Sequence, residues 1–307
     1  MTHRSGFVTL IGRPNAGKST LLNALVGDKL AIVSEKPQTT RTSVQGVLTL
    51  PDAQVVFIDT PGIHESKTLL NRRMMTVVRS ALEQRDLILY LTDCTVPFGA
   101  PEQEALNILS KVSTPALLLL TKVDLLQDKR WLLPRIEQFK SVREFEDYLP
   151  VSAVSGEGME VLRQAIVSRL PEGPPFFPPD YLTDQPERFL ASEMIREKIL
   201  EETRQEVPHS VAVLVDQWQE TPKLTRIAAT IFVERPGQKA ILIGAKGATM
   251  KKIGSAARTE IETMLGKKVF LELFVKVTPE WRESEEFLKA IDWRSIGGRE
   301  LDSEPKL

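Results

Sequence analysis

The stretch from Gly12 to Ser19 has the spacing Gly-x-x-x-x-Gly-Lys-Ser, and it constrains the fold of this chain more than any other feature. An apolar run at residues 7–11 precedes it and predicts a buried strand, whereas residues 20–25 after it predict the start of a helix. In that context the glycines let several backbone N–H groups converge at a helix N-terminus, where the helix dipole adds positive charge. The stretch therefore predicts a polyphosphate site, in which Lys18 bridges the terminal phosphates and the Ser19 hydroxyl holds Mg²⁺. The alternative is a glycine-rich turn that opens an ordinary helix, and the flanking strand and helix disfavour it.

The chain has 307 residues, of which 42% are hydrophobic and 26% charged, as in a globular protein of about two domains. Its net charge of −1 excludes a whole-molecule field that attracts nucleic acid, so any basic surface must be local. Cys94 is the single cysteine, so an intrachain disulfide is impossible and a reducing compartment is the simplest setting. No apolar run reaches the roughly 18 residues of a membrane span, and no signal-peptide core is present. We therefore expect a cytoplasmic protein.

Strands alternate with helices over residues 1–170. Residues 87–92 and 116–120 are continuous apolar runs, which are typical of a parallel sheet covered on both faces. Two further strands are predicted at 43–50 and 54–58. Helical patterns separate the strands at residues 69–84, 101–112, 132–139 and 159–170. This alternation predicts a doubly wound α/β domain, with ligand loops at the carboxyl ends of the strands.

Two loops after the phosphate loop are predicted to respond to the nucleotide. Asp59-Thr60-Pro61-Gly62 follows a buried strand, so the Asp59 carboxylate is placed to bind Mg²⁺ through water and Gly62 frees the backbone to approach a γ-phosphate. A simple turn is the alternative for this tetrapeptide. In the polar loop 31–41, Thr40 is expected to contact Mg²⁺ and the γ-phosphate, which predicts an order-disorder switch of residues 34–42.

The segment Thr121-Lys122-Val123-Asp124 follows the strand at 116–120 and is predicted to hold the base. The Asp124 carboxylate can accept hydrogen bonds from N1–H and the N2 amine of guanine, and adenine offers no matching pair. The Lys122 stem would lie over the base, and the Ala153 N–H, after Ser152, would bond the guanine carbonyl. An ion-paired loop lysine and a helix-capping serine are the alternatives.

Together these loops resemble those of the translation-factor-type GTPases over roughly residues 5–170. The resemblance implies GTP and GDP as ligands, with Mg²⁺ held by Ser19, Thr40 and Asp59, and with Lys18, Thr40 and Gly62 acting in hydrolysis. The residues expected to contact the nucleotide are Gly12, Asn15, Ala16, Gly17, Lys18, Ser19, Thr20, Asp59, Thr60, Pro61, Gly62, Thr121, Lys122, Asp124, Ser152 and Ala153. One position departs from the family pattern. Thr121 replaces the usual asparagine, and its shorter reach predicts a lower nucleotide affinity.

Ile63 stands where many GTPases have the glutamine that orients the attacking water. An aliphatic side chain cannot do this, so we expect slow intrinsic hydrolysis. GTPases that resemble this chain in the apolar replacement often use a monovalent cation, held partly by an asparagine of the phosphate loop. Asn15 occupies that position, so K⁺ is a candidate second metal; alternatively, Asn15 stabilises the loop through side-chain-to-backbone bonds. His64 is expected to be an exposed loop residue.

The segment 171–182 is predicted to link two domains. Five prolines in residues 171–179 prevent a helix or a central strand and predict a stiff, extended connector. Phe176 and Phe177 are interpreted as anchors onto a neighbouring domain, and a proline-rich binding segment is the alternative.

The region 183–295 predicts a smaller α+β domain, with a helix at 186–206, strands at 210–215 and 227–234, helices at 238–243 and 249–265, and a strand at 268–277. Gly244-Ala245-Lys246-Gly247 lies between the last two helices, where glycines let a nucleic-acid backbone come close and Lys246 offers a charge to phosphates. A bland helix break is the alternative. Residues 235–268 carry eight basic side chains against two acidic ones, which favours phosphate contact. The residues expected to bind RNA are Ile243, Gly244, Ala245, Lys246, Gly247, Lys251, Lys252 and Arg258.

This domain resembles a type II KH domain, which grips about four nucleotides of single-stranded RNA. A GTPase domain, a proline-rich connector and such a KH domain together resemble the bacterial Era family over nearly the whole chain, with Pro37-Gln38-Thr39-Thr40-Arg41 and the Gly-Ala-Lys-Gly loop as close matches. The resemblance implies binding to the 3′ end of small-subunit ribosomal RNA during assembly of the 30S subunit, and peripheral contact with the inner face of the cell membrane. We expect a monomer with a disordered tail at 296–307.

Two other functions remain open from the sequence. The basic face of the second domain would also suit a protein partner or an anionic membrane surface, although the Gly244–Gly247 loop favours RNA. An ATPase is disfavoured by Asp124.

Overall fold

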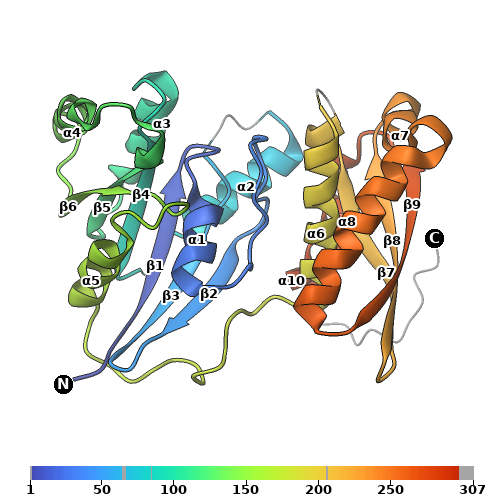
Figure 1. Cartoon of the computed structure of the whole chain (residues 1–307). Coiled ribbons are helices and arrows are strands. Elements are labelled where there is room, and N and C mark those ends of the chain that lie inside the picture. Colours follow the sequence, from blue (N-terminus) through green and yellow to red (C-terminus); the bar gives the residue numbers. More distant parts are fainter. Residues whose placement is uncertain (1, 64–66, 84, 205–206, 297–307) are drawn as a thin grey trace. The chain divides into compact units, whose positions relative to one another are not determined.

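The computed structural model describes residues 2–63, 67–83, 85–204 and 207–296, and it divides into two compact units (Figure 1). The first unit comprises Met1–Lys67 and Asn71–Gln185, and the second comprises Thr68–Leu70 and Pro186–Leu307. The expectations for His64 and for residues 297–307 of the predicted tail 296–307 lie outside the described residues, whereas Ile296 ends the helix Trp293–Ile296. None of the helices among these residues is long and apolar enough to cross a membrane.

The first unit is built on one six-stranded sheet. Its strands are β1 (Arg4–Gly12), β2 (Val44–Thr49), β3 (Ala53–Asp59), β4 (Leu87–Asp93), β5 (Ala116–Thr121) and β6 (Asp147–Val151). They lie in the order β2-β3-β1-β4-β5-β6, and all neighbours are parallel except β2 and β3, which form a hairpin at one edge. The predicted doubly wound α/β architecture is confirmed, with one antiparallel edge strand.

Helices cover both faces of this sheet (Figure 1). They are α1 (Lys18–Val26), α2 (Leu69–Ser80), α3 (Ala100–Leu109), α4 (Leu132–Lys140) and α5 (Met159–Arg169). Leu22 of α1 and Leu162 of α5 pack in one apolar cluster, whereas Met75 of α2 and Leu106 of α3 pack in the cluster on the other face. Burial on both faces explains why β4 and β5 are uninterrupted apolar runs in the sequence.

The parallel strands end at the same edge of the sheet, and the predicted ligand loops begin there. Gly12 ends β1, Asp59 ends β3, Thr121 ends β5 and Val151 ends β6. Because ligands of open α/β sheets bind at the carboxyl ends of the strands, this edge is the candidate site of the first unit.

The connector is fastened to the outer edge of the β2–β3 hairpin. The Phe177 ring stacks on Tyr181 with a centroid distance of 4.5 Å, and both rings pack against the cluster that contains Val47 and Val56. The backbone N–H of Val47 donates to the Leu182 carbonyl at 2.8 Å. The connector is therefore a packed part of the first unit along this edge, in addition to joining two segments of chain.

A single buried side chain, Gln54, holds the middle of the connector. Its Oε1 accepts hydrogen bonds from the N–H groups of Phe176 at 2.7 Å and Phe177 at 2.9 Å. Its Nε2 donates to the Phe177 carbonyl at 2.9 Å and to the Thr49 hydroxyl at 3.0 Å. Gln54 itself has no exposed surface, whereas the four bonds are part-buried because their partners lie nearer the surface.

The second unit is a three-stranded sheet with helices on one face (Figure 1). The strands β7 (Ala212–Glu220), β8 (Leu224–Val233) and β9 (Lys268–Val277) lie in this order; β7 is antiparallel and β9 parallel to β8. The main helices are α6 (Glu187–Glu202), α7 (Pro236–Ile243) and α8 (Ala248–Leu265), and the short helices α9 (Glu285–Ala290) and α10 (Trp293–Ile296) follow β9. The predicted order of helix, two strands, two helices and strand is confirmed.

The hairpin of β7 and β8 is longer than the sequence predicts. The first strand, expected at 210–215, continues to Glu220. The second, expected at 227–234, already begins at Leu224. The register shifts between Val215 and Gln217, so a bulge interrupts the alternation of side chains there. The added part is polar and largely exposed, and a period-2 apolar pattern therefore cannot reveal it.

Candidate functional site

The phosphate loop of the first unit adopts backbone angles that require its glycines. Gly12 has φ +156°, and a Cβ on it would lie 2.3 Å from the Leu91 carbonyl oxygen. Gly17 has φ +89° and caps the start of α1, and Asn15 between them also has a positive φ of 63°. The first N–H groups of α1 have no partner within the helix, so the loop presents donors where a phosphate would bind.

Lys18 lies at the bottom of this loop. Its Nζ donates to the Gly12 carbonyl at 3.3 Å and to the Arg13 carbonyl at 2.9 Å. Burial lowers the pKa of Lys18 to about 8, although the negative charge of Asp59 opposes the shift. A bound polyphosphate would add negative charge beside this ammonium group and would favour its charged form.

Three oxygen-bearing side chains meet beside Lys18. Ser19 Oγ donates to Asp59 Oδ2 at 2.6 Å, and Thr40 Oγ1 lies 2.8 Å from Ser19 Oγ and 3.4 Å from Asp59 Oδ2. The other carboxylate oxygen, Asp59 Oδ1, is buried and makes no hydrogen bond within the described part of the chain. Burial raises the pKa of Asp59, while Lys18 and the hydrogen bonds from Ser19 and Thr40 act in the opposite direction. Because Mg²⁺ prefers oxygen ligands, these three side chains fit a magnesium site.

The cavity above the phosphate loop has a volume of about 280 Å³. Eight residues expected at the nucleotide line it, namely Asn15, Gly17, Lys18, Ser19, Thr20, Thr40, Gly62 and Lys122. It is also lined by Pro14, Ile32, Val33, Ser34, Glu35, Gln38, Thr39 and Leu125, most of which the sequence places only in a polar loop. Asn15 Nδ2 donates to the Glu35 carbonyl at 2.6 Å, so the phosphate loop is tied directly to the segment expected to switch.

The Asp59–Gly62 loop closes against the phosphate loop. A Cβ on Gly62 would lie 2.6 Å from the Cα of Pro14, so a side chain at this position would force the two loops apart. The Ile63 N–H donates to the Gly12 carbonyl at 3.1 Å. The Ile63 side chain is 4% exposed and packs in the core with Ile11, so it is not placed to orient a water molecule.

Three buried members of the predicted set, Ala16, Thr60 and Pro61, lie outside the cavity lining. The Thr60 hydroxyl donates to the Leu10 carbonyl at 2.8 Å and so ties the end of β3 to β1. Ala16 and Pro61 are buried beside it along this edge of the sheet. The sequence could not separate such residues from those that face the ligand, because both kinds belong to the same motifs.

Thr121 connects the base-binding segment with the phosphate loop. Its buried hydroxyl lies 2.9 Å from the Ala16 carbonyl oxygen and 3.0 Å from the Thr92 carbonyl oxygen. A threonine can therefore fasten this segment to the phosphate loop, although it has one hydroxyl hydrogen for two acceptors.

The remaining base-site residues lie in two neighbouring loops. Lys122 has φ 60°, and its Nζ forms an ion pair with Asp93 at 2.7 Å, while Asp124 is exposed in the 3₁₀ turn Val123–Leu125. Ser152 is buried, and its Oγ accepts from the N–H of Ser155 at 3.0 Å. The serine thus shapes the turn that presents Ala153, which is half-buried. Asp124, Ser152 and Ala153 lie outside the lining of the cavity above the phosphate loop.

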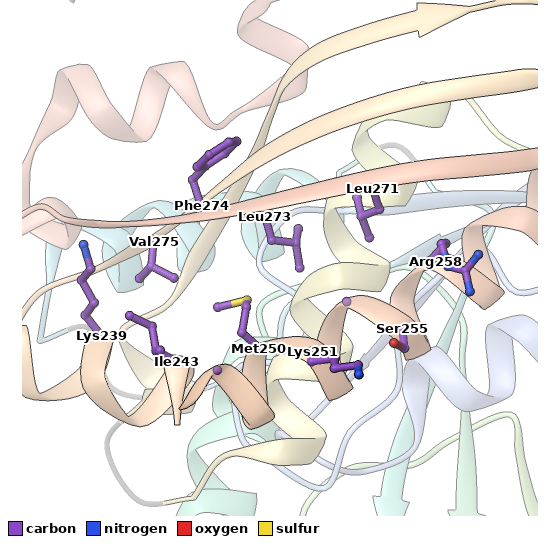
Figure 2. A pocket seen from close by; sticks show the side chains of 12 residues that line it. Lys239, Ile243, Met250, Lys251, Ser255, Arg258, Leu271, Leu273, Phe274 and Val275 are labelled. Carbon is purple, nitrogen blue, oxygen red and sulfur yellow. The ribbon is translucent and has the colours of Figure 1, made fainter. Parts of the chain in front are cut away.

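The second unit contains a larger groove between α7, α8 and β9 (Figure 2). Its volume is about 720 Å³. The Gly244–Gly247 loop lies at its end, where Gly244, Lys246 and Gly247 have φ values of 69°, 51° and 80°. A Cβ on Gly244 would lie 2.2 Å from the Thr249 hydroxyl, whereas nothing lies within 4 Å of a Cβ on Gly247. Because this space is open and glycine has no side chain, the backbone of a ligand could come close to Gly247.

Four of the residues expected to bind RNA line this groove, namely Ile243, Gly247, Lys251 and Arg258. Gly244, Ala245 and Lys246 lie in the adjoining loop. Lys252 does not line the groove, and its Nζ forms an ion pair with Glu202 of α6 at 2.8 Å. The sequence missed the other lining residues, which are Lys239, Met250, Gly254, Ser255, Leu271, Leu273, Phe274 and Val275. Apolar residues stand at every second position of β9, namely Leu271, Leu273 and Val275, and this pattern could have indicated the strand face that lines the groove.

The fold and these two sites define a P-loop GTPase joined to a KH-type nucleic-acid-binding domain. Residues 7–122 match the family described as "50S ribosome-binding GTPase", and residues 206–282 match the family described as "KH domain". The chain belongs to the Era family of GTPases. It is 50% identical to GTPase Era of Geobacter metallireducens over 292 residues, which cover 94% of this chain and 98% of that protein. It is 44% identical to GTPase Era of Staphylococcus epidermidis, with 95% and 97% covered.

Two solved Era structures are similar over both units, each at 39% identity. An Aquifex aeolicus Era variant bound to GDP·AlF4⁻ matches with a TM-score of 0.91, covering 94% of this chain and 99% of that one. Era in complex with MgGDPNP and nucleotides 1506–1542 of 16S ribosomal RNA matches with a TM-score of 0.92, covering 95% and 99%.

Proposed function

We propose that this protein is a GTP-hydrolysing switch that binds the 3′ end of 16S ribosomal RNA and acts in the assembly of the 30S subunit, in the cytoplasm. The observation that carries the proposal is the groove with its Gly244–Gly247 loop, joined in one chain to a complete set of GTPase loops. The similarity to an Era structure that contains both MgGDPNP and 16S ribosomal RNA supports it.

In the first unit, each side chain has a task that its position supports. Lys18 neutralises the β- and γ-phosphates, and the backbone N–H groups at the start of α1 bind the phosphate oxygens. Ser19, Thr40 and Asp59 hold Mg²⁺, which supplies electrostatic stabilisation of the charge on the transferred phosphoryl group when bound. Asp124 selects guanine. Ile63 faces the core, so the intrinsic rate of hydrolysis is slow.

K⁺ is proposed as a second metal of this site. Asn15 Nδ2 donates to the Glu35 carbonyl at 2.6 Å, so a K⁺ ion held by the Asn15 side-chain oxygen and this carbonyl would replace that hydrogen bond. We expect GTP hydrolysis to be several-fold faster in KCl than in NaCl of equal ionic strength, and Asn15→Ala to remove the difference. If Asn15→Ala lowers the rate equally in both salts, the side chain only stabilises the loop.

Two adjacent lysines provide a matched test of the RNA site. Lys251 lines the groove, whereas Lys252 pairs with Glu202 away from it. We expect Lys251→Ala to weaken binding of single-stranded RNA from the 3′ end of 16S ribosomal RNA several-fold and to reduce the salt slope by about 1, because one phosphate contact is lost. Lys252→Ala should bind almost like the wild type. Equal effects of both substitutions would contradict the assignment of the groove.

A second measurement separates RNA from other partners of the basic face. Crosslinking of the purified protein to RNA, followed by sequencing of the attached fragments, should yield the 3′ end of 16S ribosomal RNA and should differ between a GTP analogue and GDP. Flotation with anionic vesicles together with failed crosslinking would instead favour membrane docking.

A further inference from the structure

Strand β9 has two faces, and three of its four groove residues lie on one of them. Leu271, Leu273 and Val275 point from β9 toward α8, whereas Phe274 projects from the opposite side of the strand at the rim of the groove (Figure 2). Phe270 shares the face of Phe274, since side chains alternate along a strand. Both rings are unusually open for phenylalanine, because Phe270 is 48% and Phe274 56% exposed.

The residues of β8 that lie beside these two rings are small or cationic. Arg226 of β8 pairs in register with Phe270, and its guanidinium lies 5.7 Å from the centre of the ring. Thr230 lies opposite Phe274, and Ala228 lies between these two positions on β8. The two rings are four residues apart on the strand, or about 13 Å at the usual rise of a strand. They can therefore accept two separate flat groups.

The two exposed rings and the arginine beside them are features of a platform for unpaired bases. Exposed aromatic rings on a sheet stack bases of any sequence, and a neighbouring arginine can bind phosphate or stack in turn. A buried apolar partner is disfavoured because the exposed Glu272 stands between the rings on the same strand. The platform is continuous with the groove, since Phe274 belongs to both.

We propose that single-stranded RNA leaving the groove crosses the edge strand β9 and stacks two unpaired bases on Phe274 and Phe270, with Arg226 beside the backbone. This inference rests on the proposed RNA-binding function and adds a second subsite to it. A KH groove grips about four nucleotides, whereas the RNA in the related Era complex spans nucleotides 1506–1542, so an RNA of that length is long enough to continue beyond a groove.

The test compares two RNA lengths on the full-length protein. One probe is a strand of about four nucleotides, which fills the groove only, and the other is a single strand of about ten nucleotides from the 3′ end of 16S ribosomal RNA. The double variant Phe270→Leu, Phe274→Leu keeps apolar side chains and removes both rings. We expect it to bind the longer RNA about tenfold or more weakly, and the short RNA, which meets Phe274 only at the rim of the groove, at most about threefold more weakly. Phe274→Tyr, which keeps a ring, should bind the longer RNA normally.

A stacking signal and two controls complete the design. Quenching of 2-aminopurine in the longer RNA should be lost in the Leu double variant, whereas an unchanged calorimetric transition of the second unit reports that this unit is folded. Lys251→Ala should weaken both RNAs, because it acts in the groove. Unchanged binding of the longer RNA by the Leu variant, equal weakening of both RNAs, or a change in sedimentation mass that reveals a self-association surface would each overturn the inference. If the wild type binds neither RNA, the proposed function itself fails.

Discussion

The hydroxyl of Thr121 shows how one residue can depart from a family pattern and keep a structural task. It reaches the Ala16 carbonyl at 2.9 Å and the Thr92 carbonyl at 3.0 Å, and both contacts are buried. The shorter side chain therefore still joins the base-binding segment to the phosphate loop. The lower affinity expected from the sequence remains a prediction.

Thr121→Val tests this task, since valine has nearly the same shape and no hydroxyl. We expect the affinity for GDP to fall about fivefold to tenfold, because the carbonyl of the phosphate loop loses its partner and the loop is less well held, at a cost of about 1 kcal/mol. Nucleotide titration by calorimetry or with a fluorescent GDP measures the change.

The control for that experiment is Thr9→Val. Thr9 is equally buried in the same sheet, and its hydroxyl donates to the Ala81 carbonyl at 2.6 Å, away from the nucleotide loops. Both variants should lose a similar amount of stability, and only Thr121→Val should lose affinity. If the affinity of Thr121→Val equals that of Thr9→Val, the hydroxyl has no role at the nucleotide.

At the scale of elements, the connector at 171–182 does more than join two domains, because it packs on the first unit. The buried side chain of Gln54 in β3 makes four hydrogen bonds, three to the connector and one to Thr49. Gln54→Leu should destabilise the first unit by about 2 kcal/mol, since it leaves backbone groups of Phe176 and Phe177 without partners. Limited proteolysis should then cut the connector faster, while intrinsic GTP hydrolysis stays near the wild-type rate.

Gln54→Glu is the matched variant for this prediction. A carboxylate can still accept the two N–H bonds, but it has no donor for the Phe177 carbonyl or for Thr49. An intermediate rate of cleavage is expected. Equal protection of the connector in wild type, Gln54→Leu and Gln54→Glu would show that Phe177 and Tyr181 hold it without Gln54.

The elements also show which features the sequence can predict. Strands β4 and β5 and the phosphate loop were predictable, because burial on both faces and a glycine-rich spacing leave strong local patterns. The packing of the connector on Gln54 was not, because a buried glutamine in a strand has no pattern of its own. The different positions of Lys251 and Lys252 were not predictable either. The two lysines are adjacent in sequence but lie on different faces of α8.

At the scale of the whole molecule, the two units carry separate ligand sites and separate cores. GDP with Mg²⁺ should therefore stabilise the first unit, and a short single-stranded RNA the second. At a concentration 100 times the dissociation constant, a ligand adds about 2.7 kcal/mol, which corresponds to a rise in unfolding temperature of about 5–10 °C for the first unit and to a larger rise for the smaller second unit. Calorimetry should show two transitions, of which each ligand moves one.

Removal of Mg²⁺ with EDTA should reverse most of the shift caused by GDP and leave the shift caused by RNA unchanged. The control is Asp59→Asn, in which the EDTA effect should be small because the carboxylate of the metal site is gone. A single transition that both ligands raise together would contradict the prediction of independent units.

The edge of β2 gives the connector a protective role. Unpaired N–H and C=O groups on an edge strand invite pairing with another chain, and proteins commonly cover such edges. Here the Leu182 carbonyl accepts from Val47, and the Thr183 hydroxyl donates to the Gln45 carbonyl at 2.6 Å. A GTPase fragment that ends at Leu170 would expose this strand together with the apolar cluster beneath Phe177, and would be prone to aggregate. A fragment that continues to Gln185 keeps the connector that covers both.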